Sequence, residues 1–99
     1  MRRGELRRYI RPSRPDQPTT VAILSNDGIN DSDRPWVLGV TLRATDPSDL
    51  LAVPVAGHGW AYAGDLSRLY RAWIRGPVGK LDAATLQRID GTLRAALDL

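Results

Sequence analysis

Short apolar runs separated by turn-forming residues dominate the first half of the chain. Residues 5–10 (ELRRYI) alternate imperfectly between polar and apolar and predict a first strand. Residues 20–25 (TVAILS) are apolar and β-branched, which is typical of a strand covered on both faces, and a third strand is predicted at about 36–44 (WVLGVTLRA). The three prolines of RPSRPDQP (11–18) make that segment a loop, and NDGINDSDRP (26–35) has the composition of a turn.

The second half of the chain continues with shorter runs. A strand is predicted at 50–55 (LLAVPV), where Pro54 favours a sheet edge or the end of the strand. WAYA (60–63) and LYRAWI (69–74) predict two more strands, and Gly76-Pro77 is expected to interrupt the chain after them.

The last segment, DAATLQRIDGTLRAALDL, has the periodicity of an amphipathic helix that begins after Asp82. The carboxylate of Asp82 is expected to cap the first turn by accepting a hydrogen bond from a free amide. Leu81 and Leu86 have the spacing of a hydrophobic staple around that cap. The apolar stripe that needs a partner surface consists of Leu86, Ile89, Leu93 and Leu97.

Five or six short strands followed by one helix predict a mainly β fold with a C-terminal α-helix. We expect a small, mainly antiparallel sheet or half-barrel on which the helix packs, forming one domain over residues 1–99. Apolar residues make up 42% of the chain and charged residues 25%, as in ordinary globular proteins. Cysteine is absent, and no apolar run approaches the roughly 20 residues that cross a bilayer, so we expect neither disulfides nor a membrane span.

The basic residues are unevenly distributed. The net charge is only +3, yet six of the 14 basic residues lie in the first fourteen positions, against one acid, Glu5. A cluster of this kind favours contacts with the phosphates of a nucleic acid. The alternative is a solvated basic edge with no polyanion partner.

Few residues suggest chemistry on their own. A phosphate-binding glycine loop and a serine elbow are both missing, and His58 is the only histidine and has no neighbours at ligand spacing, so no metal site is predicted. His58 is either a general acid/base or a structural or exposed loop residue. Asp16 lies close to Arg14, and a carboxylate beside a guanidinium can act as a base while the cation stabilises a developing phosphorane. The alternative for this pair is a surface ion pair of little energetic value.

Three further polar residues have open interpretations. Thr41 lies in a predicted strand, where threonine is common on propensity alone, and its hydroxyl matters only if it points into a cleft. Asp65 and Arg68 lie at a junction between strands, where an aspartate forms turns and an arginine is solvated.

Several motifs in the same order resemble the MazF/PemK family of bacterial toxins. The opening RRGELRR, a loop with DQ, and VAILSND..N resemble that family's RGE(I/V) strand, GSEQ loop and RPVLVVSND..N strand. The third run, VLGVT, is similar to V..VPVT, and the end of the chain, VGKLDAATLQRIDGTLRAALDL, is similar to (I/L)G.L....L..VD.AL...L.L. The likeness spans nearly the whole chain.

This resemblance implies an SH3-like half-barrel of the CcdB/PemK type that acts as a cytoplasmic toxin of a type II toxin–antitoxin pair. Typical members are metal-independent endoribonucleases without a cofactor that cut single-stranded RNA at short sequences. By position, the resemblance implies that Asp16 matches the catalytic loop glutamate, Thr41 the threonine at the strand end, and Asp65 an aspartate of PemK-like members. Arg68 follows Asp65 where those members also have an arginine.

Two family arginines are missing. Thr19-Thr20 stand where the family has an arginine before the second strand, and Ala63-Gly64 precede Asp65 where PemK-like members have another. We expect Arg14 or Arg43 to supply the lost charge. The residues expected to act in catalysis are Arg14, Asp16, Thr41 and Asp65, and those expected to bind RNA are Arg11, Arg43 and Arg68.

Two alternatives keep the fold but not the reaction. One is a protein-binding toxin that resembles CcdB and inhibits DNA gyrase, and the other is a catalytically degenerate binding module. The expected partners are RNA, a partly disordered and acidic antitoxin, and a second copy of the chain, because an open barrel leaves an apolar sheet edge. No membrane partner is expected.

Overall fold

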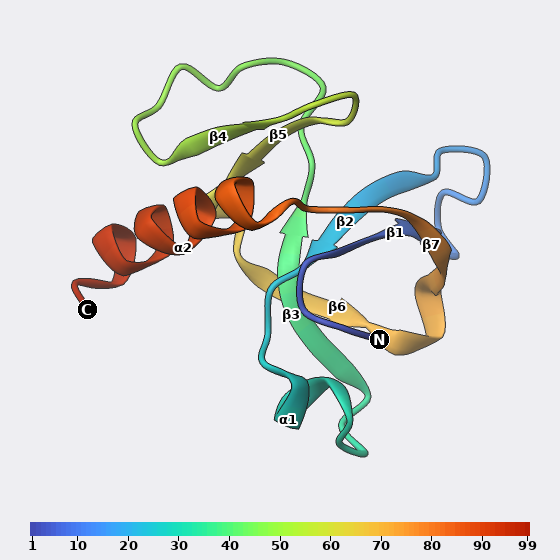
Figure 1. Ribbon diagram of the computed structural model, residues 1–99. Coiled ribbons are helices and arrows are strands. Elements are labelled where there is room, and N and C mark those ends of the chain that lie inside the picture. Colours follow the sequence, from blue (N-terminus) through green and yellow to red (C-terminus); the bar gives the residue numbers. More distant parts are fainter.

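A curved antiparallel sheet forms the centre of the molecule in the computed structural model, which describes all 99 residues (Figure 1). A long helix and a small hairpin lie on the same side of that sheet. The main sheet contains β1 (Glu5–Tyr9), β2 (Thr19–Ile23), β3 (Trp36–Thr41), β6 (Ser67–Tyr70) and β7 (Ile74–Lys80), and the hairpin contains β4 (Ala52–Val55) and β5 (Gly59–Tyr62). The helical elements are α1 (Asp27–Asn30), the 3₁₀ turns η1 (Ala63–Asp65) and η2 (Arg71–Trp73), and α2 (Ala83–Leu97).

The strands of the main sheet follow the order β6-β3-β2-β1-β7, and every neighbouring pair is antiparallel. The register places Leu6 opposite Ala22, and Val21 opposite Thr41. Because successive side chains of a strand point to opposite faces, each strand contributes to two separate cores. The predicted fold class, a mainly β half-barrel with a C-terminal helix, is confirmed, with seven strands rather than five or six.

One hydrophobic core lies on each face of the sheet. The first is covered by α2 and the hairpin, and the second fills the concave side closed by β6, η2 and β7. The buried residues of the first core are Leu6, Ala22, Leu24, Val40, Val53, Val55, Ala61, Leu81 and Ile89. Those of the second are Tyr9, Val21, Ile23, Val37, Leu69 and Ile74. The apolar run at 20–25 is therefore covered on both faces, as its composition predicted.

The helix begins and packs as the sequence predicts. Asp82 is the N-cap, and its carboxylate accepts a hydrogen bond from the Thr85 amide at 2.7 Å, which lowers the pKa of Asp82. Leu81 is buried and Leu86 packs against the same core. The apolar stripe ends sooner than predicted, because Leu97 is 56% exposed. None of the helices is long and apolar enough to cross a bilayer.

The region after β6 differs from the prediction. LYRAWI (69–74) is not one strand, because β6 ends at Tyr70 and η2 turns the chain into β7. Gly76-Pro77 does not interrupt the chain and lies inside β7. A proline has no amide to donate, but β7 is an edge strand whose pairing with β1 is irregular on both sides of Arg7, so the missing donor is tolerated.

The predicted turn at 26–35 contains the short helix α1, held by side chains of the SND..N motif. Asn26 caps α1 by accepting a hydrogen bond from the Ile29 amide at 2.9 Å. The buried Asn30 donates to the Ser25 carbonyl at 2.9 Å and accepts from the Ser25 hydroxyl. That hydroxyl in turn accepts from the Leu38 amide at 3.1 Å. The motif shared with the toxin family therefore has a structural role in this chain.

Candidate functional site

Several of the predicted site residues meet at one end of the main sheet. Since neighbouring strands are antiparallel, the ends of β1 and β3 lie beside the starts of β2 and β6. The 11–18 loop joins β1 to β2 at this end, and Thr41 is the last residue of β3. The pairing continues beyond β3, because the Leu42 amide donates to the Thr20 carbonyl at 2.9 Å.

Arg43 and Asp65 form the best-defined contact of this end. Leu42 packs on the core under α2, so the alternation of the strand directs Thr41 and Arg43 to the opposite face. Arg43 donates from Nε and Nη2 to the two carboxylate oxygens of Asp65, at 2.7 and 2.8 Å. The hydrogen bonds and the charge of Asp65 raise the pKa of Arg43. This bidentate geometry fixes the plane of the guanidinium.

The backbone of Arg43 is also fixed. Its amide and carbonyl exchange two 2.8 Å hydrogen bonds with Trp60 of the hairpin. The preceding residue, Gly59, has φ = +109°, and a methyl group there would lie 2.2 Å from the Arg43 carbonyl oxygen. Only glycine permits this approach. The hairpin and the extension of β3 are therefore held together at the candidate site.

Tyr62 joins this cluster from the end of β5. The guanidinium carbon of Arg43 lies 5.0 Å from the centre of the Tyr62 ring, within cation–π distance. The Tyr62 hydroxyl donates to Asp49 Oδ2 at 3.2 Å, and this hydrogen bond, with the charge of Asp49, raises the pKa of Tyr62. Neither Tyr62 nor Asp49 was among the predicted site residues. Their spacing follows no motif, because they meet only through the pairing of β4 with β5.

The 11–18 loop contributes groups that have no partner within the chain. Arg14 and Asp16 are exposed, and neither side chain makes a hydrogen bond or an ion pair. Arg11 lies with its guanidinium carbon 5.4 Å from the centre of the Tyr9 ring. The loop opens at the same sheet end as Thr41, but Arg14 and Asp16 contact neither Arg43 nor Asp65.

Arg68 lies apart from the other predicted residues. It stands opposite Leu38 in the pairing of β6 with β3, and it neighbours Leu69, which points into the concave core. Alternation therefore places Arg68 on the face opposite to Thr41 and Arg43. Its guanidinium carbon lies 5.3 Å from the centre of the Trp36 ring.

Three arginines of the N-terminal cluster pair with acidic residues of the chain, and three do not. Arg2 pairs with Asp27, Arg3 pairs with Asp90 and donates to the Leu24 carbonyl, and Arg7 pairs with Glu5. Burial raises the pKa of Glu5, but hydrogen bonds from the Arg2 amide and from Arg7 outweigh it, so the pKa is lowered. For these three arginines, the predicted contact with phosphates competes with an acidic partner inside the chain. Arg8, Arg11 and Arg14 have no acidic partner.

His58 lies in the exposed turn between β4 and β5. Its ring approaches β7, since a methyl group at Gly79 would lie 3.2 Å from His58 Nε2. No group of three or more His, Cys, Asp or Glu side chains is placed to hold a metal ion. Nothing in its contacts connects His58 with Arg43 or Asp65.

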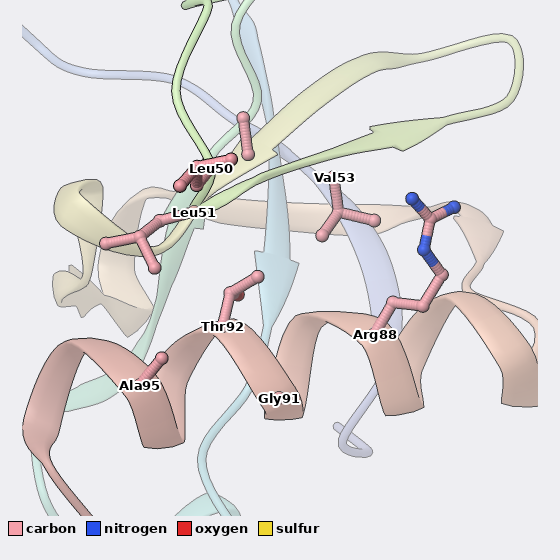
Figure 2. Close-up of a pocket in the computed structure, with 8 residues that line it drawn as sticks. Leu50, Leu51, Val53, Arg88, Gly91, Thr92 and Ala95 are labelled. Atoms are coloured by element: carbon pink, nitrogen blue, oxygen red, sulfur yellow. The ribbon is translucent and has the colours of Figure 1, made fainter.

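A separate, mostly apolar groove runs between α2 and the strand β4 (Figure 2). Leu51 and Val53 face it from the hairpin side, and Thr92 and Ala95 from α2. Leu50 at its margin is 98% exposed. The groove contains only one charged side chain, Arg88, and none of the residues predicted to act on RNA.

This arrangement of a five-stranded antiparallel sheet, a small hairpin and a C-terminal helix recurs in solved structures. An endoribonuclease from Mycobacterial species is 23% identical, with a TM-score of 0.82 over 100% of this chain and 92% of its own. A second, in complex with its cognate antitoxin, is 22% identical, with a TM-score of 0.86 over 100% of this chain and 96% of its own.

A chain of the MazE–MazF complex from Deinococcus radiodurans is 15% identical, with a TM-score of 0.83 over 100% of this chain and 96% of its own. By sequence, the chain matches no family model and no curated protein. The chain has the fold of MazF-type toxins over its whole length, as the sequence resemblance implied.

Proposed function

We propose that the chain is the toxin of a toxin–antitoxin pair and cleaves single-stranded RNA in the cytoplasm. The observation that carries this proposal is the guanidinium of Arg43, which Asp65 orients at the sheet end where Thr41 and the 11–18 loop lie. The Arg43 side chain is 46% exposed, so a phosphate can reach it. The solved structures of the same fold include endoribonucleases, which favours this function over gyrase inhibition.

The reaction needs a base, a cation and an exposed site. In this proposal Asp16, whose carboxylate has no partner in the chain, takes the proton of the ribose 2′-hydroxyl. The 2′-oxygen bonds to phosphorus, and the bond from phosphorus to the 5′-oxygen breaks. The departing 5′-oxygen takes a proton from water, and the hydroxide formed takes the proton held by Asp16. The products are a 2′,3′-cyclic phosphate and a 5′-hydroxyl.

The remaining residues stabilise the phosphorane in this proposal. Arg43 and Arg14 supply positive charge, and the Thr41 hydroxyl donates a hydrogen bond to a phosphate oxygen. Both oxygens of Asp65 accept hydrogen bonds from Arg43, so we assign Asp65 to holding that arginine rather than to proton transfer. Arg11 extends the cationic surface along the loop. Arg68 lies on the opposite face of the sheet, so it contacts the RNA only if the RNA chain passes around the sheet to that face.

The test is cleavage of a pool of single-stranded RNA by the purified chain in the presence of a chelator. We expect cleavage by the wild type, a rate at least about 100-fold lower for Arg43→Ala, and a similar loss for Asp16→Ala. Arg14→Ala should reduce the rate by about 10-fold, because Arg43 remains. Arg88→Ala is the matched control, since it removes an exposed arginine from α2 outside the proposed site.

The outcomes separate the alternatives. Absence of cleavage with any RNA, while cells that express the chain stop growing, would overturn the nuclease proposal in favour of a protein-binding toxin of the CcdB type. Absence of both effects would indicate a degenerate binding module. Loss of cleavage in Arg88→Ala alone would place the active site elsewhere.

Two protein partners belong to the same proposal. An acidic, partly disordered antitoxin would cover the loop, where Arg11 and Arg14 lack acidic partners, and one of the structures with this fold is an endoribonuclease in complex with its antitoxin. A homodimer would pair along β7, an edge strand on which Val78 is 40% exposed. Sedimentation as a monomer at micromolar concentration would contradict the dimer.

A further inference from the structure

We propose that Tyr62 and Asp49 are positioning residues that hold the guanidinium of Arg43 ready for a phosphodiester. The inference rests on the proposed function for its substrate and on the contacts of three side chains for its geometry. The contact between these two residues is not required by the packing of the fold, because the Asp49 side chain is exposed and Tyr62 belongs to neither hydrophobic core.

Arg43 is held on two sides and free on a third. Asp65 accepts from Nε and from one hydrogen of Nη2, and the Tyr62 ring lies against the guanidinium at 5.0 Å. A guanidinium carries five N–H donors, so three remain, two on Nη1 and one on Nη2. These three are available to a phosphate in a fixed plane, which reduces the conformational entropy lost on binding.

The Tyr62 ring is itself held in place through its hydroxyl. That hydroxyl donates to Asp49 Oδ2 at 3.2 Å, while the other oxygen of Asp49 accepts from the Leu51 amide at 2.8 Å. Asp49 thus uses one oxygen to fix its own turn and the other to fix Tyr62. These contacts link the turn at Asp49, which lies between β3 and β4, to the Tyr62 ring and through that ring to the guanidinium of Arg43.

Charge alone does not account for this arrangement. The Asp65 carboxylate lies directly against Arg43, and its negative charge weakens the attraction of a phosphate. A site selected only for affinity would leave Arg43 without this partner. The presence of Asp65 is explained if the orientation of Arg43 matters more to the reaction than the local potential, as expected for stabilisation of a transition state.

The first experiment needs no RNA and measures solvent exchange of the Arg43 Nε proton by NMR. In Tyr62→Leu and Asp49→Ala we expect exchange to be several-fold faster than in the wild type. In Asp49→Asn the single oxygen accepts from the Leu51 amide and the side-chain NH2 donates to the Tyr62 hydroxyl, so the link to Tyr62 is kept and slow exchange should be restored. Asp46→Ala is the matched control, because it removes a carboxylate from the same segment, one that accepts from the Ser48 amide and not from Tyr62. Unchanged exchange in Tyr62→Leu and Asp49→Ala overturns the inference.

The second experiment is a double-mutant cycle on single-turnover RNA cleavage. We expect Tyr62→Leu to lower the rate constant by about 10-fold, Tyr62→Phe by about 3-fold, and affinity for an uncleavable 2′-deoxy analogue to change less than the rate. In the Arg43→Ala background, Tyr62→Leu should have no further effect. Equal effects in both backgrounds would indicate a purely structural residue and overturn the inference.

The two experiments also separate this inference from the proposed function. If the wild type cleaves no RNA but exchange responds as expected, the function fails and the positioning of Arg43 stands. If cleavage occurs and Tyr62→Leu has the same effect with and without Arg43, the function stands and the positioning role fails.

Discussion

The two ends of the main sheet each contain an arginine in contact with polar groups, and the two arginines are used in opposite ways. At the α1 end, Arg71 donates to the carbonyls of Ile29, Asn30, Ser32 and Arg34. At the other end, Arg43 directs two donors to Asp65 and keeps three free. An arginine that donates to four backbone carbonyls stabilises a loop, whereas one that keeps three donors free can bind a ligand.

The largest effects are expected when each of the two guanidinium groups is removed in a separate variant. These variants test directly whether Arg71 and Arg43 differ in role. Arg71→Met keeps the apolar stem but removes one donor from each of four carbonyls, of which only Ile29 keeps a bond from Ser32, so we expect a loss of about 2 kcal/mol in the free energy of unfolding. Arg43→Met should leave chemical denaturation unchanged and reduce RNA cleavage at least about 100-fold. Urea denaturation and cleavage rates measured on both variants provide the check.

The reverse pattern would refute the distinction between the two ends. If Arg71→Met lowered cleavage per folded molecule, or if Arg43→Met lowered stability as much as Arg71→Met, the two arginines would have the same role. Arg88→Met on α2 serves as the control for loss of an exposed guanidinium.

A smaller effect is expected on the pH dependence of stability, through Asp27 at the α1 end of the sheet. Hydrogen bonding from the Arg3 amide, supported by Asn30 and Arg2, lowers the pKa of Asp27 below its ordinary value of 3.8. A carboxyl with a lower pKa in the folded than in the unfolded state stabilises the fold above pH 3.8, and this contribution disappears as the pH falls through the folded-state value.

We therefore expect the wild type to be more stable than Asp27→Asn at pH 7, and the difference to shrink below pH 3.8. Urea denaturation of both proteins at pH 7, 5 and 3 measures it. A difference that stays constant over this range would show that the charge of Asp27 contributes nothing.

Much of the fold was predictable from local patterns. The alternating and β-branched runs gave β1, β2 and β3, and the cap at Asp82 gave the start of α2. The prediction failed at 69–74, where the 3₁₀ turn η2 divides the segment, because apolar and aromatic residues on both sides of the turn are equally typical of one strand. It also failed at Pro77, whose tolerance depends on β7 being an irregular edge strand.

The candidate site was less predictable, because its contacts join segments that are far apart in the sequence. Arg43 was singled out as a substitute cation, yet its partners Tyr62 and Asp65 follow from the pairing with the hairpin. The acidic partners of Arg2 and Arg3 were not predicted, since Asp27 and Asp90 are 25 and 87 residues away. The roles of Asp16 and Thr41 stay predictions.

A substitution at Gly59 can change the geometry of the Arg43 site without changing its charge. No L-residue fits against the Arg43 carbonyl at that position, so an uncharged replacement such as Gly59→Ala displaces the main chain of the arginine while the formal charge of +3 stays the same. Geometry and electrostatics can therefore be varied independently in this protein, the first at position 59 and the second at position 43.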